Sequence, residues 1–210
     1  MFRSVTPQEF QNAIADGPAS PAFHEQFLRF VSFEDLMDVE AVVYDGDLRV
    51  SGSFRAPGLC TLIVGNLDVE DVVDLQSHFD QGGLFIVLGN VTCRHFISEY
   101  GLTGFIDGDL VAQDSIVADF SDSGLSVIGT LRTRLFIGCD IGAYVGAGAA
   151  MDYGVGYCTP IGDDVAPVIR PLHDESATAR IVVPPANTEG YMFNGEQFVD
   201  LIRAGQPIFK

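Results

Sequence analysis

Residues 106–112 read Ile-Asp-Gly-Asp-Leu-Val-Ala, and this short pattern recurs along the chain. An apolar residue, one spacer and a glycine are followed by Asp, Asn or Thr, then by Leu or Val, with a small or apolar residue two positions further on. The glycines stand 19 to 24 residues apart, a period typical of stacked repeat architectures. The copies cover residues 43–50, 63–69, 87–93, 106–112 and 127–133, with glycines at positions 46, 65, 89, 108 and 129.

Each copy has the features of short β-strands that meet at a corner. Apolar residues alternate, as at Leu67 and Val69, which is the period of a strand with one face directed inward. Gly followed by Asp or Asn tolerates the positive φ of a sharp bend. A second apolar pair follows most copies, as at Phe96-Ile97, and adds a further strand. Such a unit closes no core alone, but units stacked about 4.8 Å apart pair in parallel and bury a continuous column.

The sequence therefore predicts an all-β chain that forms a right-handed parallel β-helix (solenoid) of about five or more turns. The right hand is expected because nearly all parallel crossovers have it. A doubly wound α/β fold is rejected, because it needs amphipathic helices of about ten or more residues between its strands. The connections in this chain are too short and too rich in β-branched residues for that.

Short α-helical attachments are expected at both ends. Thr6-Pro-Gln-Glu9 is a capping box that opens a helix ending near Gly17, and Ser20-Pro21 opens a second. Asn194 begins a C-terminal helix that Gly205 and Pro207 stop. We expect the N-terminal helices to cover the first turn, and the C-terminal helix to cover the last turn or lie along the rod.

These features divide the chain into residues 1–40, an N-terminal helical cap; 41–162, the parallel β-helix; and 163–210, a C-terminal extension with an edge strand and a helix. Residues 137–157 are rich in Gly and Ala and predict one or two degenerate turns. Residues 181–185, Ile-Val-Val-Pro-Pro, predict the edge strand, ended by its prolines.

Charge is the most unusual property of the composition. Of the 210 residues 29 are acidic and 11 basic, which gives a net charge of −18. Nucleic acid and anionic membranes are therefore not expected as partners, because phosphates require Lys and Arg. A protein partner, possibly a basic one, or self-association is expected instead. The N-terminal residues lack the apolar core of a signal peptide, so we expect a cytoplasmic, bacterial-type protein.

One set of side chains was considered for metal binding. Asp47, Asn66, Asn90 and Asp109 occupy the same position in consecutive repeats, so they predict a ladder along one corner. Their oxygens suit a row of calcium or other cations. Stacked amides at a corner explain the row better, because a bidentate Glu is missing. Whether the ladder binds a cation stays open at this point.

No residue is assigned to catalysis, to a cofactor or to a metal. The four histidines (24, 78, 95 and 173) lack metal-ligand spacing, and the four cysteines contain no C-x-x-C pair. Cys93 occupies an inward position and is expected to be a core thiol. Gly146-Ala-Gly148 is only a partial nucleotide-binding motif, because Ala149 and Ala150 follow instead of a third glycine. No nucleophile elbow G-x-S-x-G occurs.

The repeat, as in Ile106-Asp-Gly-Asp-Leu-Val-Ala112, resembles uncharacterised bacterial β-helix proteins of a "polymer-forming" family, and residues 201–208 resemble their endings. The match covers about residues 40 to 140 and the C-terminal tail. This family has no established catalytic residues. The repeat is also similar to that of bactofilins, whose β-helices polymerise end to end. This resemblance implies self-assembly, which the helical ends of this chain would block.

Three functions follow as hypotheses. The first is a non-enzymatic scaffold or protein-binding protein, possibly of the immunity type, that presents an acidic β-helix surface. The second is a self-assembling, bactofilin-like structural protein. The third is a carbohydrate-binding or carbohydrate-active β-helix, which rests on fold analogy alone.

Overall fold

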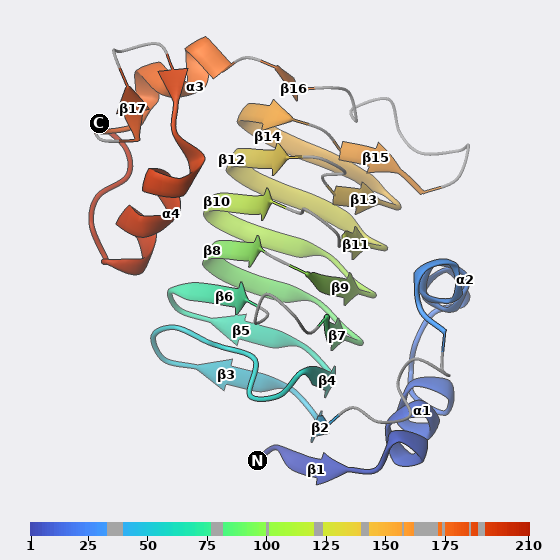
Figure 1. The fold of residues 1–210 in the computed structure, drawn as a ribbon. Coiled ribbons are helices and arrows are strands. Elements are labelled where there is room, and N and C mark those ends of the chain that lie inside the picture. Colours follow the sequence, from blue (N-terminus) through green and yellow to red (C-terminus); the bar gives the residue numbers. More distant parts are fainter. Residues whose placement is uncertain are drawn as a thin grey trace.

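The predicted repeats stack into a parallel β-helix in the computed structural model (Figure 1). Each repeat glycine lies over the glycine of the preceding repeat, so closely that a side chain on Gly65 or Gly108 would meet the backbone below at under 3 Å. A side chain is therefore disfavoured in this column from Gly65 to Gly129. The structure describes residues 1–32, 40–76, 82–99, 101–119, 124–139, 143–156, 158–161, 172–173, 175–184, 186–188 and 192–210.

Two long sheets form the walls of the β-helix. The order of the first sheet is β1 (Arg3–Val5), β2 (Ala41–Asp45), β4 (Cys60–Val64), β7 (Gly83–Val87), β9 (Leu102–Ile106), β11 (Leu125–Val127), β13 (Ala143–Val145) and β15 (Cys158–Pro160). The order of the second is β3 (Leu48–Val50), β5 (Leu67–Val69), β8 (Val91–Glu99), β10 (Leu110–Asp119), β12 (Thr130–Cys139), β14 (Gly148–Gly156) and β16 (Leu172–His173), with β6 (Val72–Gln76) also on β8.

The long strands of the second sheet bend in the middle. The pairing of β10 with both β8 and β12 shifts register between Ala112 and Ser115, which marks a β-bulge. The bend divides the second sheet into two faces, so the β-helix has three. The outer side of the first sheet is called the N-helix face. The outer side of β3, β5 and the first halves of β8, β10, β12 and β14 is the open face, and the outer side of β6 and the second halves is the C-helix face.

Residues 137–157, expected as degenerate turns, contain a complete turn in register. β13 pairs with β11, and β14 pairs with β12 from Gly148 to Val155. Ala147 takes the place of the repeat glycine, and Gly148 takes the place of the Asp or Asn, with φ of +146°. Small residues thus replace the motif without interrupting the stack.

The N-terminal helices do not cover the first turn, contrary to the sequence prediction. α1 (Pro7–Ala15) and α2 (Pro21–Phe30) begin at the predicted caps Thr6 and Ser20 but lie along the N-helix face (Figure 1). The first turn is instead bordered by β1, which pairs antiparallel with β2. The residues in contact are Phe10, Ile14, Phe23 and Phe27 of the helices and Ala41, Val43, Cys60, Leu62, Leu84, Ile86, Leu88 and Phe105 of the sheet.

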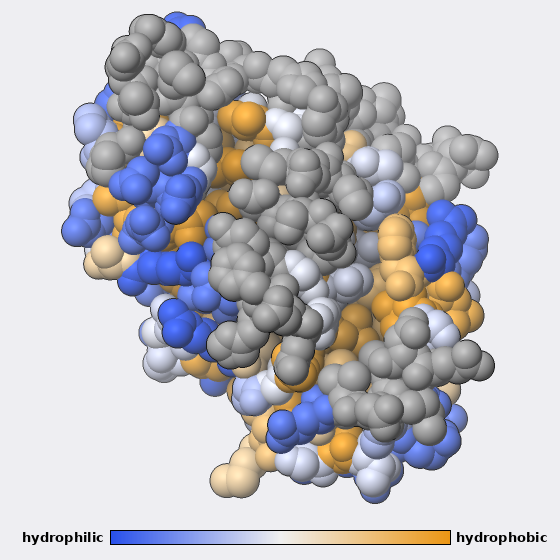
Figure 2. Space-filling model, in the orientation of Figure 1, coloured by the Kyte–Doolittle hydropathy of each residue, from blue (hydrophilic) through white to orange (hydrophobic). Residues whose placement is uncertain are grey.

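Part of α2 faces solvent. Leu28 and Phe30 are 62% and 47% exposed, and a hydrophobic area surrounds this helix in the space-filling view (Figure 2). Phe30 still packs beside Tyr144, with ring centroids 5.2 Å apart. The helix thus reaches across the face toward the later turns.

The C-terminal extension lies along the rod, which is one of the two expected positions. α4 (Gly195–Arg203) starts after the predicted cap Asn194 and covers the C-helix face, where Phe198 and Ile202 join the outward side chains of the strands. The predicted edge strand at residues 181–185 is wrong. Ile181 ends α3 (Glu175–Ile181), and Val182 forms an isolated bridge to Phe209. Helix-favouring Ala177 and Ala179 carry the helix into the first residue of that run. A two-stranded ribbon, β17 (Asn187–Thr188) and β18 (Met192–Phe193), completes the extension.

Among the helices that the structure describes, none combines the length and apolar character needed to cross a membrane.

Candidate functional site

The open face consists of one outward side chain per turn. The register places Arg49 beside Asp68, Thr92 beside Val111, and Arg132 beside Ala150. Asp68 also lies beside Thr92, so these side chains form one continuous row. All are exposed except the half-buried Val111. In order along the rod, the row is Arg49, Asp68, Thr92, Val111, Arg132 and Ala150.

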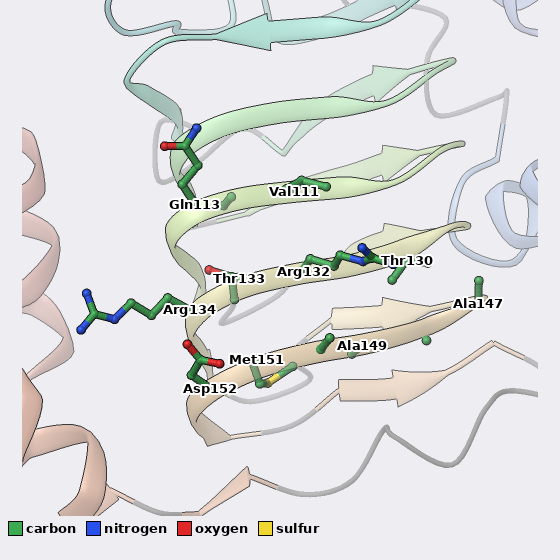
Figure 3. A pocket seen from close by; sticks show the side chains of 13 residues that line it. Val111, Gln113, Thr130, Arg132, Thr133, Arg134, Ala147, Ala149, Met151 and Asp152 are labelled. Atoms are coloured by element: carbon green, nitrogen blue, oxygen red, sulfur yellow. The ribbon is translucent and has the colours of Figure 1, made fainter.

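An open groove of about 810 Å³ lies over β10, β12 and β14, which form the half of this face toward the last turns (Figure 3). Small side chains such as Ala147 and Ala150 create the hollow, and Arg132 lies along its centre. The groove is lined by Val111, Ala112, Gln113, Thr130, Arg132, Thr133, Arg134, Ala147, Gly148, Ala149, Ala150, Met151 and Asp152.

Arg132 differs from its neighbours on the open face in its electrostatic environment. Arg49 lies 3.9 Å from Asp68, and the hydroxyl of Thr92 donates to Asp68 at 2.9 Å. Within the described part of the chain, no ion pair joins Arg132 to a carboxylate. A protein with a net charge of −18 thus has an exposed guanidinium without an ion-pair partner in its groove.

Alternating charges follow the corner between the open face and the C-helix face. The row is Asp71, Arg94, Asp114, Arg134 and Asp152, one residue per turn. Arg94 binds Asp114 at 2.8 Å. Arg134 points away from the groove, with its guanidinium 4.0 Å from the ring centre of Phe209 (Figure 3). Sequence reasoning missed this row, although each member follows an inward residue of an aligned repeat by one or two positions.

The predicted ladder forms the opposite corner, and its oxygens face the protein. The Asp47 Oδ1 atom accepts from the backbone N–H of Asn66 at 2.8 Å, and the Asn66 Oδ1 atom accepts from that of Asn90 at the same distance. The Asn90 Oδ1 atom accepts from Asp109, and the Asp109 Oδ1 atom from Thr130. Each rung thus binds the next turn, as expected for corner chemistry. The described residues contain no group of three or more His, Cys, Asp or Glu suited to a metal ion.

Ser115, His95 and Asp114 meet on the C-helix face, where His95 and Ser115 are buried and Asp114 is partly exposed. His95 Nδ1 is 2.8 Å from the Ser115 hydroxyl, and Nε2 is 3.7 Å from an Asp114 oxygen. Burial lowers the pKa of His95 from 6.5 to about 4; the charge of Arg94 acts in the same direction, while Asp114 and Asp71 oppose it. The imidazole is therefore neutral near pH 7. Ser115 is fully buried, so its hydroxyl meets no substrate in this conformation.

A second buried polar cluster joins α4 to the β-helix. The Arg203 guanidinium donates to Asp74 at 2.8 Å and to Glu99 at 2.7 Å. Both carboxylates are about 95% buried, and Arg55 binds Asp74 from the solvent side at 3.1 Å. No sequence pattern predicts this cluster, because Asp74 and Arg203 lie 129 residues apart. It holds a helix in place.

The described thiols are buried in the core. Cys93 faces inward as predicted, and burial raises its pKa. Burial also raises the pKa of Cys60 to about 11 and that of Cys158 to about 12. Thiolates are therefore scarce at neutral pH. Of the other residues considered for metal binding, His24 is half-buried in α2, while His78 and the side chains of Cys139 and His173 lie outside the described set.

No family model, no curated protein and no solved structure matches this chain. The resemblance to polymer-forming β-helix proteins and to bactofilins therefore stays a prediction from the repeat.

Proposed function

We propose that the chain is a non-enzymatic scaffold that presents the open face of its β-helix to a protein partner. The observation that carries this proposal is that the described helices cover two of the three faces of the β-helix and leave the third exposed. Helices from the two chain ends cover the N-helix face and the C-helix face, whereas no described element lies over the open face.

The burial of the reactive side chains supports a binding role. Among the described residues, His95, Ser115, Asp74 and Glu99 belong to clusters of groups suited to proton transfer or nucleophilic attack, and all four are buried on the C-helix face. Chemistry at any of them would require that extension to move. The exposed groove contains Arg132 but no histidine, cysteine or glutamate among its lining residues.

The partner is expected to meet the face through mixed charges. The net charge of −18 attracts a partner with a basic surface at long range, and the pattern of Arg49, Asp68 and Arg132 sets the register of contact. The free, buried Cys60, Cys93 and Cys158 suit a reducing compartment such as the cytoplasm.

Two alternatives have less support. End-to-end polymerisation needs parallel strand pairing at each end. β1 lies antiparallel on the first strand of one sheet, and β16 lies antiparallel on the last strand of the other. Carbohydrate binding commonly uses aromatic stacking, and none of the residues that line the groove is aromatic.

Affinity capture at moderate salt tests the proposal with three baits: the wild-type chain, Val111→Arg, and Arg29→Asp. Val111→Arg places a charge at the centre of the face, whereas Arg29 lies on α2 and pairs with Glu25. A protein retained by the wild type and by Arg29→Asp, but lost with Val111→Arg, is the expected result. No specific partner, or one that ignores Val111→Arg, contradicts the proposal.

A further inference from the structure

The order of charges in the outward row of the open face is complementary to the same row of a second copy that runs in the opposite direction. Neighbouring members lie about 4.8 Å apart, so the row spans about 24 Å. Arg49 and Asp68 occupy its first two positions, counted from the N-terminal turn, while Arg132 occupies the fifth of the six. The middle pair, Thr92 and Val111, is uncharged.

We propose that the open face binds the open face of a second copy of this chain, antiparallel, about a two-fold axis that passes between Thr92 and Val111. This inference rests on the proposed function, because it names one protein that the open face accepts.

The antiparallel arrangement leaves no like charges opposed in the row. Asp68 of each copy meets Arg132 of the other, which gives that guanidinium an ion-pair partner twice per dimer. Thr92 meets Val111. A parallel arrangement would instead place Asp68 against Asp68 and Arg132 against Arg132, and like charges across an interface are unfavourable. The order of charges therefore selects one orientation.

The shape of the face agrees with this pairing. The axis places Arg49, the first member of the row in one copy, opposite Ala150, the last member of the row in the other. Arg49 is 86% exposed, so it is free to extend, and Ala150 lies in the groove that small side chains create. A long side chain thus meets a hollow, and Asp152 at the edge of the groove offers a carboxylate.

The two corners are compatible as well. Because the axis lies in the plane of the interface and across the rods, each corner meets the same corner of the second copy in reverse order. On one side the position of Asp71 then faces that of Arg134, whose side chain lies against Phe209, and Arg94 faces Asp114. On the ladder side Asp109 faces Asn90. No two charges of the same sign are opposed at either corner.

The size of the face makes the dimer weak. A strip about 24 Å long and about 10 Å wide falls well below the roughly 800 Å² per partner of a standard interface. Each copy also carries a charge of −18, although at physiological salt a screening length of about 8 Å limits this repulsion. We expect a dissociation constant on the order of 0.1–1 mM.

Sedimentation equilibrium with a reciprocal charge exchange tests the pairing. Arg132→Asp opposes two carboxylates and Asp68→Arg opposes two guanidiniums, so each is expected to weaken association at least about fivefold. The double variant Arg132→Asp/Asp68→Arg restores opposite charges and is expected to restore association. Within one copy these residues lie three turns, or about 14 Å, apart, too far for a direct ion pair. Rescue therefore arises between copies.

Arg29→Asp is the matched control, because it changes the net charge as Arg132→Asp does but lies on α2. It is expected to associate as the wild type does. A wild-type chain that stays monomeric up to millimolar concentration overturns the dimer, as does association that neither single variant weakens or that the double variant fails to restore. If the dimer fails while capture still depends on Val111, the proposed function stands and only its partner changes.

Discussion

The N-helix face and the C-helix face are both covered by helices from the chain ends, yet the contacts under the two covers differ in kind. Under α1 and α2 the contact is mainly aromatic and aliphatic, with Phe23 and Phe27 packed on Phe105. Its polar contacts include neutral Gln26 donating to the Ser126 hydroxyl and the Ser20 backbone N–H donating to Asp107 at the edge of the cover. On the C-helix face the apolar cluster that includes α4 lies beside two polar pairs, His95 with Ser115 and Arg203 with its carboxylates.

This difference predicts how each cover responds to its surroundings. An apolar contact depends on buried area and shape, and pH hardly affects it. A buried polar contact depends on which protons are bound. The contact of the N-terminal helices with the β-helix should therefore stay nearly constant with pH. The contact of the C-terminal extension should weaken when its buried groups change charge.

The largest effect is expected from Phe105→Ala. Phe105 is fully buried and lies with its ring centroid 5.1 Å from that of Phe27. Its loss removes the centre of the N-terminal contact and should lower the free energy of unfolding by about 4 kcal/mol. Urea unfolding measures it, with the exposed Leu28→Ala as control. A loss below about 1 kcal/mol would show that the helices contribute little to stability.

Arg203→Met should have the next largest effect. The change leaves Glu99 buried without its guanidinium and leaves Asp74 with only Arg55, which is itself 75% exposed. Removing one partner of a buried ion pair costs about 3–5 kcal/mol. Because Arg55 still pairs with Asp74, the expected loss lies at the lower end, about 3 kcal/mol.

Two measurements check this. Urea unfolding gives the stability, and hydrogen exchange reports whether α4 opens before the β-helix does. Arg29→Met is the control, because its pair with Glu25 is exposed and is worth well under about 1 kcal/mol. Equal losses in the two variants would contradict the difference drawn between the covers.

Much of the β-helix was predictable because its determinants are local. The repeat glycines, the ladder and the inward Cys93 follow from positions within one turn, and the helix caps at Thr6 and Asn194 follow from adjacent residues. Stacking then repeats the same local contacts, so one aligned motif fixes the register of several strands.

The placement of the covers was not predictable in the same way, because an amphipathic helix fits any apolar surface. One signal was present. Residues 84–88 are a continuous apolar run rather than an alternating one, and residues 60–64 are apolar except for Thr61, which indicates strands buried on both sides. The Asp74–Arg203 contact had no such signal, since each residue alone looks like an ordinary surface charge.

The pH dependence of the C-terminal cover should come next in size. Because the pKa of His95 is lowered from 6.5 to about 4, the unfolded chain binds a proton between these values while the folded chain does not. The stability from neutral His95 is thus complete above pH 6.5 and is lost as the pH falls toward 4. Between pH 7 and pH 4.5 the loss should be about 2 kcal/mol.

Comparison with His95→Gln isolates this loss, because the carboxylates of Asp114 and Asp71 and the guanidinium of Arg94 remain in both proteins. The wild type should lose more stability than the variant over this pH range, and hydrogen exchange should increase first in α4. Parallel pH profiles for the two proteins would mean that His95 titrates normally and that the cover is not sensitive to its charge.

The smallest effect is expected at the ladder, whose hydrogen bonds lie at an exposed corner and which therefore measures the exposed part of the fold. Asn90→Ala removes the oxygen that accepts from the Asp109 N–H and the amide that donates to Asn66. Water replaces these partners at an exposed corner, so the loss should be about 1 kcal/mol. Gln113→Ala, at the other corner, is the control and should change stability by less than about 0.5 kcal/mol. A loss as large as that of Arg203→Met would mean that the corner holds the turns together as strongly as a buried ion pair holds α4, and the stability of the rod would then be assigned to its ladder rather than to its covers.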